Sequence, residues 1–210
     1  MFGMFSGADG FNNGAEPLDW NTVKVTDMSN MFWDAISFNN GQSPGQCSAP
    51  LGFNTVNVTN MSQMFRGAIS FNQSIENWVT SAVDDTSYMF CDAVAFNQSI
   101  NIQSVDGARW WDLSLLSNCE STFEGAINFN NGYSPGTHSG SVFWLENLRR
   151  SSLVNASRMF YGASSFNQNL KRWEGANEDS GLEDCISDVD ITDMYTGATS
   201  LEDSHKIFTC

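Results

Sequence analysis

The chain has 210 residues, of which 24 are acidic and 9 basic, so its formal net charge is −15 at pH 7. Nucleic acids and anionic membrane surfaces are therefore poor partners, whereas cations, basic proteins and neutral glycans stay open. No stretch approaches the ~18 consecutive apolar residues of a membrane span, so we expect none.

A ten-residue block recurs along the chain, and its clearest copy is Met-Phe-Arg-Gly-Ala-Ile-Ser-Phe-Asn-Gln at residues 64–73. The seven copies lie near residues 4–13, 31–40, 64–73, 89–98, 122–131, 159–168 and 194–203. We number the copies from the N-terminus and call the aromatic residue at the second position the block aromatic. Successive copies are 25 to 37 residues apart. Self-similarity at such a period is typical of a solenoid, in which each unit buries its apolar face against its neighbours.

The first element expected in each unit is a short helix, best seen over residues 25–35. Its apolar residues recur at spacings of 3, 3, 1 and 3, which indicates a helical stripe rather than the alternation of a strand. These residues are Val25, Met28, Met31, Phe32 and Ala35. Thr26 and Asp27 are N-cap candidates for this helix.

The second expected element is a short strand, as at residues 71–75, where Phe-Asn-Gln-Ser-Ile follows the block. Its Asn-Asn or Asn-Gln pair predicts a ladder of side-chain amides from unit to unit. The sequence therefore predicts one repeat solenoid over residues 1–210, with about seven coils of 25 to 37 residues stacked into a curved rod. Each coil is expected to hold a short strand and a short helix. Loops are expected at the inserts 41–50, 132–140 and 174–184.

The chain opens in the middle of a repeat. Met1 lies four residues before Phe5, the position that Met28 has before Phe32 in the second copy. An open solenoid end exposes apolar side chains and unpaired backbone. We therefore expect that the sequence belongs to a longer chain at the N-terminus, or that a partner covers this end.

Five cysteines give an odd number, so they cannot all pair within one chain. Cys119 occupies the position of Met28 in its repeat and is expected to be a buried free thiol. If any two are bridged, we choose Cys185 and Cys210, because a disulfide there would close the terminal copy.

The sequence contains no constellation that indicates catalysis, so we expect a noncatalytic protein without a cofactor. Asp188, Asp190 and Asp193 have a spacing that brings oxygen ligands toward a calcium ion. The alternative, which we favour, is a solvated acidic segment, so no metal is expected. His138 and His205 have no cysteine or carboxylate at a metal-ligand spacing and are expected to be surface residues.

Two further groups of residues are candidates for contacts or modification. Asn57, Asn60 and Asn155 begin Asn-x-Ser/Thr sequons that a eukaryotic secreted source would glycosylate. Aromatic residues at variable positions or in inserts are candidate protein or glycan contacts; they are Trp33, Trp110, Tyr133, Phe143 and Trp144. The alternative is that these aromatic side chains pack the loops onto the coils.

The repeat pattern resembles the BspA-like leucine-rich-repeat surface proteins, specifically the subfamily with the mycoplasma-type lipoprotein repeat. The residues that carry the resemblance lie in the segments 20–39, 59–78 and 158–173. It implies a leucine-rich-repeat-like solenoid and a secreted or surface-displayed module for binding or structure, and it implies no catalytic residues.

We therefore expect an extracellular or cell-surface repeat module that binds a protein or a glycan. The alternative is an architectural subunit of a larger filament, coat or multiprotein complex, whose partners are other subunits. An enzyme is the third reading and the least supported.

Overall fold

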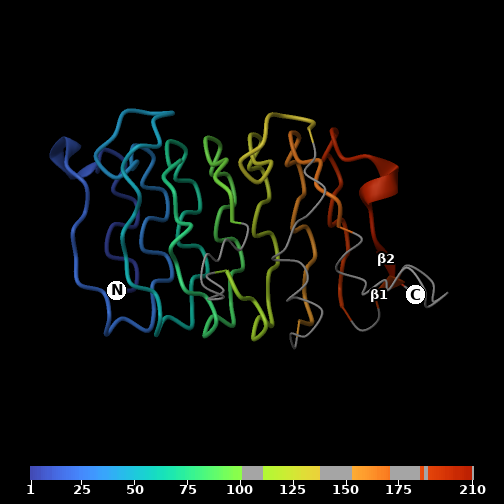
Figure 1. The fold of residues 1–210 in the computed structure, drawn as a ribbon, viewed down its shortest axis with the longest axis horizontal. Helices are drawn as coiled ribbons and strands as arrows, with labels where there is room; N and C mark the ends of the chain where they lie inside the picture. The colour runs from blue at the N-terminus through green and yellow to red at the C-terminus, as the bar shows by residue number, and fades with distance from the viewer. Residues whose placement is uncertain (101–110, 138–152, 171–184, 187–188, 210) are drawn as a thin grey trace.

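The chain folds into a stack of coils, one for each copy of the block, with the N-terminus at one end and the C-terminus at the other (Figure 1). This computed structural model describes residues 1–100, 111–137, 153–170, 185–186 and 189–209. From the second coil to the seventh, isolated parallel bridges join successive coils at one position of the repeat. Their residues are Asp27, Asn60, Asp85, Asn118, Asn155 and Asp190.

The prediction of a leucine-rich-repeat-like solenoid, with one strand and one helix in each coil, is wrong. The described residues contain no α-helix, and their regular elements are four very short segments. These are the 3-10 turns η1 (Asn13–Ala15) and η3 (Asp203–His205) and the strands β1 (Cys185–Ile186) and β2 (Phe208–Thr209). The two strands pair in parallel, with Cys185 opposite Phe208. Apart from the bridges, the other described residues form turns and irregular segments.

The backbone hydrogen bonds explain why residues 28–35 form turns instead of the expected helix. Alternate amides donate to carbonyls of the next coil at 2.7 to 3.0 Å; they belong to Met28, Asn30, Phe32 and Asp34. The amides between them donate to the carbonyl three residues earlier at 3.0 to 3.3 Å; they belong to Met31, Trp33 and Ala35. These two sets use the amides that an α-helix would direct four residues back.

Two residues in each coil adopt a left-handed backbone, and they set this alternation of turns. In the second coil they are Asn30 (φ 57°) and Asp34 (φ 53°). Gly67 and Gly125 take the place of Asp34 in the third and fifth coils. Glycine, asparagine and aspartate tolerate a positive φ at low cost, and such residues interrupt a right-handed helix. The second of the two positions holds glycine or aspartate in every coil, whereas the first also holds Gln63, Tyr88 and Arg158. The residue types at the second position therefore overrule the helical apolar spacing.

Each bridge residue also orders the turn that follows it. Asp27 Oδ1 accepts the backbone N–H of Ser29 at 2.8 Å, and Asn60 Oδ1 accepts that of Ser62 at 2.8 Å. Asp85 repeats this bond with Ser87. Such Asx turns fix the local chain direction. We infer that Asp27, instead of capping a helix, begins a turn.

The core consists of two parallel columns of phenylalanine rings. The block aromatics stack from coil to coil with ring centroids 5.5 to 5.7 Å apart; they are Phe5, Phe32, Phe65, Phe90, Phe123 and Phe160. A second column, six residues later in each coil, has centroids 5.8 to 5.9 Å apart; its rings are Phe11, Phe38, Phe71, Phe96, Phe129 and Phe166. The block aromatics therefore form one internal column along the stack. Cys119 is fully buried in the same core, as expected.

An asparagine ladder follows the second ring column. Asn39 Oδ1 accepts the backbone N–H of Asn72 at 2.9 Å, and Asn72 Oδ1 accepts that of Asn97 at 2.8 Å. The same bond continues through Asn130 to Asn167. The predicted ladder of side-chain amides from unit to unit is confirmed, and each coil is joined to the next by a side chain as well as by its backbone.

The last described coil closes the ladder with a histidine. Asn167 Oδ1 accepts the backbone N–H of Glu202 at 3.1 Å and lies 2.9 Å from His205 Nδ1. His205 is buried, so its predicted surface position is wrong. The Tyr195 hydroxyl donates to the Ile207 carbonyl, which holds the tail against the same coil.

Candidate interaction surface

The coils differ from one another mainly at two outward positions, one residue after and two residues before the block aromatic. Six of the side chains at these positions, together with Glu120, form a surface that we call the variable face. Its residues are Trp33, Arg66, Tyr88, Glu120, Glu124, Arg158 and Tyr161. All seven side chains are half-buried, so each is both held in place and accessible.

An arginine stacked between two aromatic rings lies at the N-terminal end of the variable face. The Arg66 guanidinium carbon lies 5.5 Å from the centroid of the Trp33 ring and 5.3 Å from that of Tyr88. Its Nη1 also donates to Gln63 Oε1 at 3.1 Å. These three coils present a planar cation between two π faces, a favourable arrangement for a partly desolvated arginine.

Hydrogen bonds extend the Trp33–Arg66–Tyr88 stack toward the C-terminal coils. The Tyr88 hydroxyl donates to Glu120 Oε1 at 2.6 Å, and Asn155 Nδ2 donates to Glu120 Oε2 at 3.2 Å. The bond to Glu120 raises the pKa of Tyr88, because it stabilises the protonated phenol beside a negative charge. Side chains from five successive coils are therefore linked.

An ion pair occupies the C-terminal end of the variable face. Arg158 donates to both carboxylate oxygens of Glu124, through Nε at 3.0 Å and through Nη2 at 2.5 Å. Its guanidinium carbon lies 3.9 Å from the Tyr161 ring centroid. The hydrogen bonds from Arg158 lower the pKa of Glu124, since they stabilise the carboxylate.

The described residues include three free cysteines, and burial makes two of their thiols unreactive. Cys91 lies at the variable position of the fourth coil but is buried, and desolvation raises the pKa of its thiol to about 12. Burial also raises the pKa of Cys119. Neither thiol has the lowered pKa of a nucleophile. Cys47 is exposed in the first insert.

Of the predicted contact aromatics, the structure places Trp33 on the variable face and Tyr133 exposed in the second insert. Trp110, Phe143 and Trp144 lie outside the described residues. The sequence did not single out the other six residues of the variable face. The signal that could have found them is the variation at two positions of an otherwise constant block.

The glycosylation candidates differ in their surroundings. Asn57 is exposed, and its Nδ2 donates to the Val23 carbonyl at 2.8 Å. Asn60 and Asn155 are bridge residues whose Oδ1 atoms accept bonds from Ser62 and Ser157, the third residues of their own sequons. An N-linked glycan is attached at Nδ2 and would leave these Oδ1 bonds in place. Asn60 and Asn155 are half-buried, however, so the exposed Asn57 is the most accessible of the three.

The calcium and disulfide candidates are not assembled among the described residues. Asp190 Oδ1 accepts the Thr192 amide, and Asp193 Oδ1 accepts the Thr196 hydroxyl, so both serve local turns. Asp188 lies outside the described residues, as do Cys210 and the side chain of Cys185. The described part of the chain contains no group of three or more histidine, cysteine or acidic residues placed to hold a metal ion.

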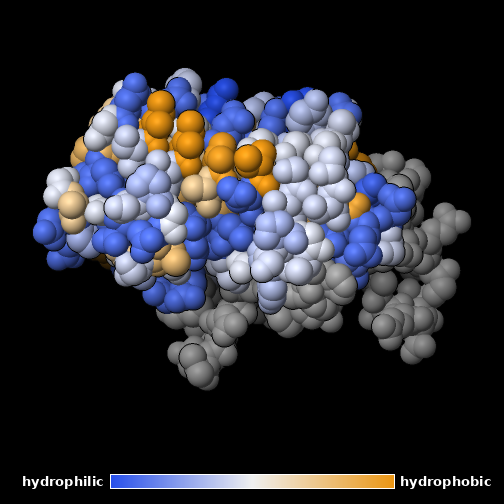
Figure 2. Space-filling view, turned by 90° about the horizontal axis from the view of Figure 1, so that it is seen from above, coloured by the Kyte–Doolittle hydropathy of each residue, from blue (hydrophilic) through white to orange (hydrophobic). Residues whose placement is uncertain are grey.

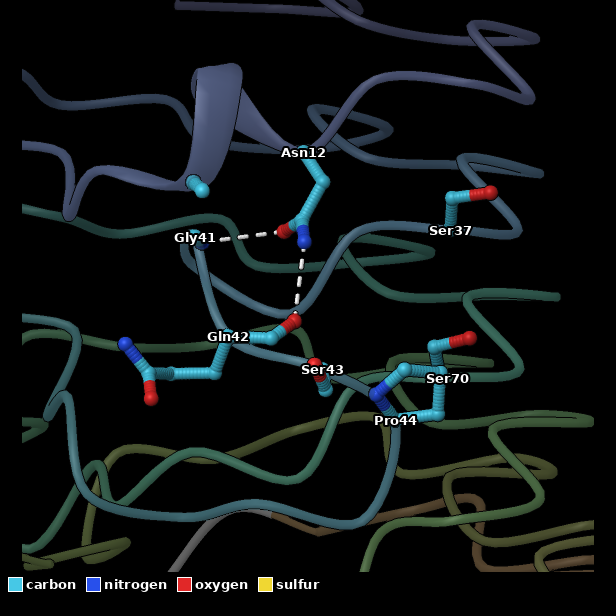
Figure 3. A pocket seen from close by; sticks show the side chains of 8 residues that line it. Asn12, Ser37, Gly41, Gln42, Ser43, Pro44 and Ser70 are labelled. Carbon is cyan, nitrogen blue, oxygen red and sulfur yellow. Dashed lines mark hydrogen bonds between the residues drawn. The ribbon is translucent and has the colours of Figure 1, made fainter.

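A polar hollow of about 310 Å³ lies where the first insert meets the first three coils (Figure 3). Asn12 spans it, because its Oδ1 accepts the Gly41 amide at 2.9 Å and its Nδ2 donates to the Gln42 carbonyl at 2.8 Å. Ser37 and Ser70 contribute hydroxyls. The residues that line the hollow include no titratable side chain, so the hollow has no general acid or base.

Comparison with known families identifies the repeat. The family model described as "Mycoplasma protein of unknown function, DUF285" matches residues 1–49, 46–142 and 109–208. The chain belongs to this family. The three overlapping matches together run from residue 1 to residue 208, as expected for a chain built from repeats. No curated protein and no solved structure matches the chain.

Membership in the DUF285 family supports the repeat organisation, and its description assigns no activity. The family model does not describe the repeat as a leucine-rich repeat. Within its described residues, this member also lacks any helix with the length and apolarity of a membrane span.

Proposed function

We propose that this DUF285 protein is a noncatalytic binding module that contacts a protein partner through the variable face. The observation that carries the proposal is the Trp33–Arg66–Tyr88 stack, held half-exposed across three coils. Tryptophan, tyrosine and arginine are the residue types that dominate binding energy at protein interfaces.

The arrangement of constant and variable positions supports the same reading. The inward positions repeat because each coil must stack on its neighbours through the same rings and asparagines. The variable face has no such constraint, and its side chains are ordered by each other, as in the Glu124–Arg158 pair at 3.0 Å. Side chains that are ordered before binding lose less entropy when a partner docks.

The geometry favours a protein over a glycan as the ligand. A sugar ring stacks on an open aromatic face, but Arg66 lies over the Trp33 ring at 5.5 Å and over the Tyr88 ring at 5.3 Å. Arginine between aromatic rings instead suits a carboxylate or a backbone carbonyl of a protein. Fixed subunits of an assembly are the alternative partner, and they would use the same surface permanently.

The same proposal includes an extracellular or cell-surface location, with the protein related in role to BspA-like surface proteins. Its support is the repeat pattern together with a surface of low charge density, since only 16% of the residues are charged. Cell fractionation tests this part separately. It compares the amount of the protein in the medium, on the cell surface and in the cytosol of the source organism.

Site-specific photocrosslinking tests the binding proposal. A photoreactive phenylalanine derivative replaces Tyr161 in one variant and Val56, an exposed residue of the third coil, in the control. Each purified variant is irradiated with intact source cells, and the products are identified by mass spectrometry. We expect a discrete protein adduct from position 161 alone, which excess wild-type protein suppresses and the Arg66→Ala variant suppresses less. Equal adducts from both positions, or none from either, would overturn the proposal.

A further inference from the structure

A line of exposed aliphatic side chains runs along the stack, at a different position from the variable face. Figure 2 shows it as a row of apolar residues on the upper face of the molecule. Its members, four residues after the block aromatic in the second to fifth coils, are Ile36, Ile69, Val94 and Ile127. We call this row the aliphatic ridge. The three isoleucines are 41 to 44% exposed.

The backbone carbonyls beneath the ridge all accept hydrogen bonds. Ser70 donates its amide to the Ile36 carbonyl at 3.1 Å, and Ala95 donates to the Ile69 carbonyl at 3.0 Å. The Val94 carbonyl accepts from Asn128 Nδ2 at 2.9 Å. The ridge therefore offers no free carbonyl at these positions for strand addition. Its side chains are β-branched, which restricts their rotamers, so the ridge is a rigid apolar surface.

Carboxylates accompany the ridge. Asp34 and Asp92 are exposed and lie two residues before Ile36 and Val94. Asp9 takes the ridge position in the first coil and is also exposed. Within the described part of the chain, none of the three belongs to an ion pair. An occupant of the ridge should therefore carry apolar residues flanked by basic ones.

We propose that the aliphatic ridge docks an amphipathic α-helix of a partner protein, with basic residues beside its apolar stripe. The spacing of the coils supports a helix. Ring centroids of the two core columns, which bracket the ridge in sequence, step by 5.5 to 5.9 Å per coil. A helix advances about 5.4 Å per turn, so one turn of the partner faces one coil.

With the ring columns as the measure of the coil step, the comparison extends over the four coils of the ridge. Three helical turns cover about 16 Å, against about 17 Å for three coil steps. An extended strand places same-face side chains about 6.6 Å apart and reaches about 20 Å over the same three steps. A helix with aliphatic residues at i, i+3, i+7 and i+10 therefore stays in register where a strand does not.

A second copy of this chain fits the ridge poorly. A stable dimer buries roughly 800 Å² on each partner, which one row of four side chains does not provide. Two copies would also bring their carboxylates together, and each chain carries a net charge of −15. A basic helix instead satisfies both the apolar row and Asp9, Asp34 and Asp92.

A designed peptide tests the proposal on the full chain. The probe is a fluorescent, 14-residue helical peptide with leucine or isoleucine at i, i+3, i+7 and i+10 and lysines on both flanks. Fluorescence anisotropy measures its affinity for the wild-type protein, for Ile69→Asp and for Val56→Asp. Val56 is the matched control because it lies in the same coil and is 42% exposed, against 43% for Ile69.

We expect the peptide to bind with a Kd below about 1 mM and Ile69→Asp to weaken it by about tenfold. Val56→Asp should change the Kd less than twofold, and a scrambled peptide of the same composition should bind about tenfold more weakly. Asp34→Asn with Asp92→Asn should also reduce the salt dependence of binding. Melting curves establish that each variant is folded, and Ile69→Ser replaces Ile69→Asp if that variant is not.

Three results would overturn the inference: no binding at about 1 mM, equal binding of the scrambled peptide, or an equal loss with Val56→Asp. A wild-type dimer in sedimentation that Ile69→Asp dissociates would assign the ridge to a second copy and reject the helix. These outcomes are independent of the crosslinking result at Tyr161, because the variable face uses other residues.

Discussion

Asn39 Oδ1 accepts the backbone N–H of Asn72, one coil further along the chain, at 2.9 Å. The same Oδ1 also accepts Gln73 Nε2 at 2.9 Å, while Asn39 Nδ2 donates to the Ser43 carbonyl of the first insert at 2.8 Å. A single buried side-chain amide thus joins two coils and holds the start of the first insert in place. Asn130 repeats these contacts at the second insert.

Replacing Asn130 by alanine should therefore destabilise the fold substantially. Asn130 is fully buried, and its side chain makes bonds of 2.7 to 2.9 Å to Ser134, Thr137, Asn167 and Gln168. We expect a loss of about 2–3 kcal/mol in the free energy of unfolding, because buried partners are left unpaired. Urea denaturation measures it, with the exposed Asn57→Ala as control. Equal midpoints for the two variants would show that the ladder is not structural.

The asparagine ladder and the ring column could be predicted from the sequence because both depend on residues that recur in almost every copy. A buried phenylalanine or asparagine at a constant place in a repeat has one simple explanation, contact with its own counterpart. Phe65 and Asn72 illustrate this. The local backbone could not be predicted in the same way, because the apolar spacing around Phe32 fits a helix as well as a succession of turns. Asn30, Asp34 and Gly67 were the residues that favoured the turns.

The candidate surfaces were harder to predict for a different reason. Trp33 was singled out because it is aromatic, but its neighbours Arg66 and Tyr88 come from other coils, and only the stacking places them against it. Ile69 was not singled out, because its position in the block holds different residue types from copy to copy, such as Asp9 and Ser164. Its exposure of 43% follows from the turn geometry, which points it away from the ring columns.

Truncating a ring should cost more in the middle of the stack than at its end. Phe90 is fully buried and contacts Phe65 and Phe123 at 5.5 Å and Phe96 at 4.0 Å. Phe90→Ala should lower the free energy of unfolding by about 3–5 kcal/mol. Phe5 is half-buried at the first coil, so Phe5→Ala should cost less than half as much. Thermal and urea unfolding of both variants measure the difference, and comparable losses would contradict a core built by stacking.

The Glu124–Arg158 pair should make stability depend on pH on the acidic side. Arg158 lowers the pKa of Glu124 below the usual 4.5, so the folded state holds this proton less tightly than the unfolded state. The contribution of the pair is therefore present above pH 4.5 and is lost as the pH falls through the lowered pKa. Both side chains are partly exposed, at 20% and 37%, which makes the effect modest and sensitive to salt.

We would measure unfolding midpoints between pH 6 and pH 3 for the wild-type protein, for Glu124→Gln and for the exposed control Glu76→Gln. The comparison isolates the contribution of the Glu124–Arg158 pair to stability. The wild-type advantage over Glu124→Gln should shrink as the pH falls, whereas the difference from Glu76→Gln should stay nearly constant. An advantage that persists unchanged at pH 3 would mean that the carboxylate is not the source of the stabilisation.

Two glycines of the first insert should respond differently to the same substitution. Gly41 (φ 83°) and Gly45 (φ 79°) both have the left-handed backbone that costs other residues about 1–2 kcal/mol. A Cβ on Gly45 meets nothing within 4 Å, whereas a Cβ on Gly41 lies 2.5 to 2.7 Å from backbone atoms of Glu16. Backbone cannot rotate aside as a side chain does, so Gly41→Ala must separate the insert from the first coil.

Gly41→Ala should therefore cost about 1–3 kcal/mol more than Gly45→Ala. It should also raise amide hydrogen exchange at Gly41, whose N–H donates to Asn12 Oδ1 at 2.9 Å. Equal stability and equal exchange in the two variants would show that the first insert does not pack on the first coil as described.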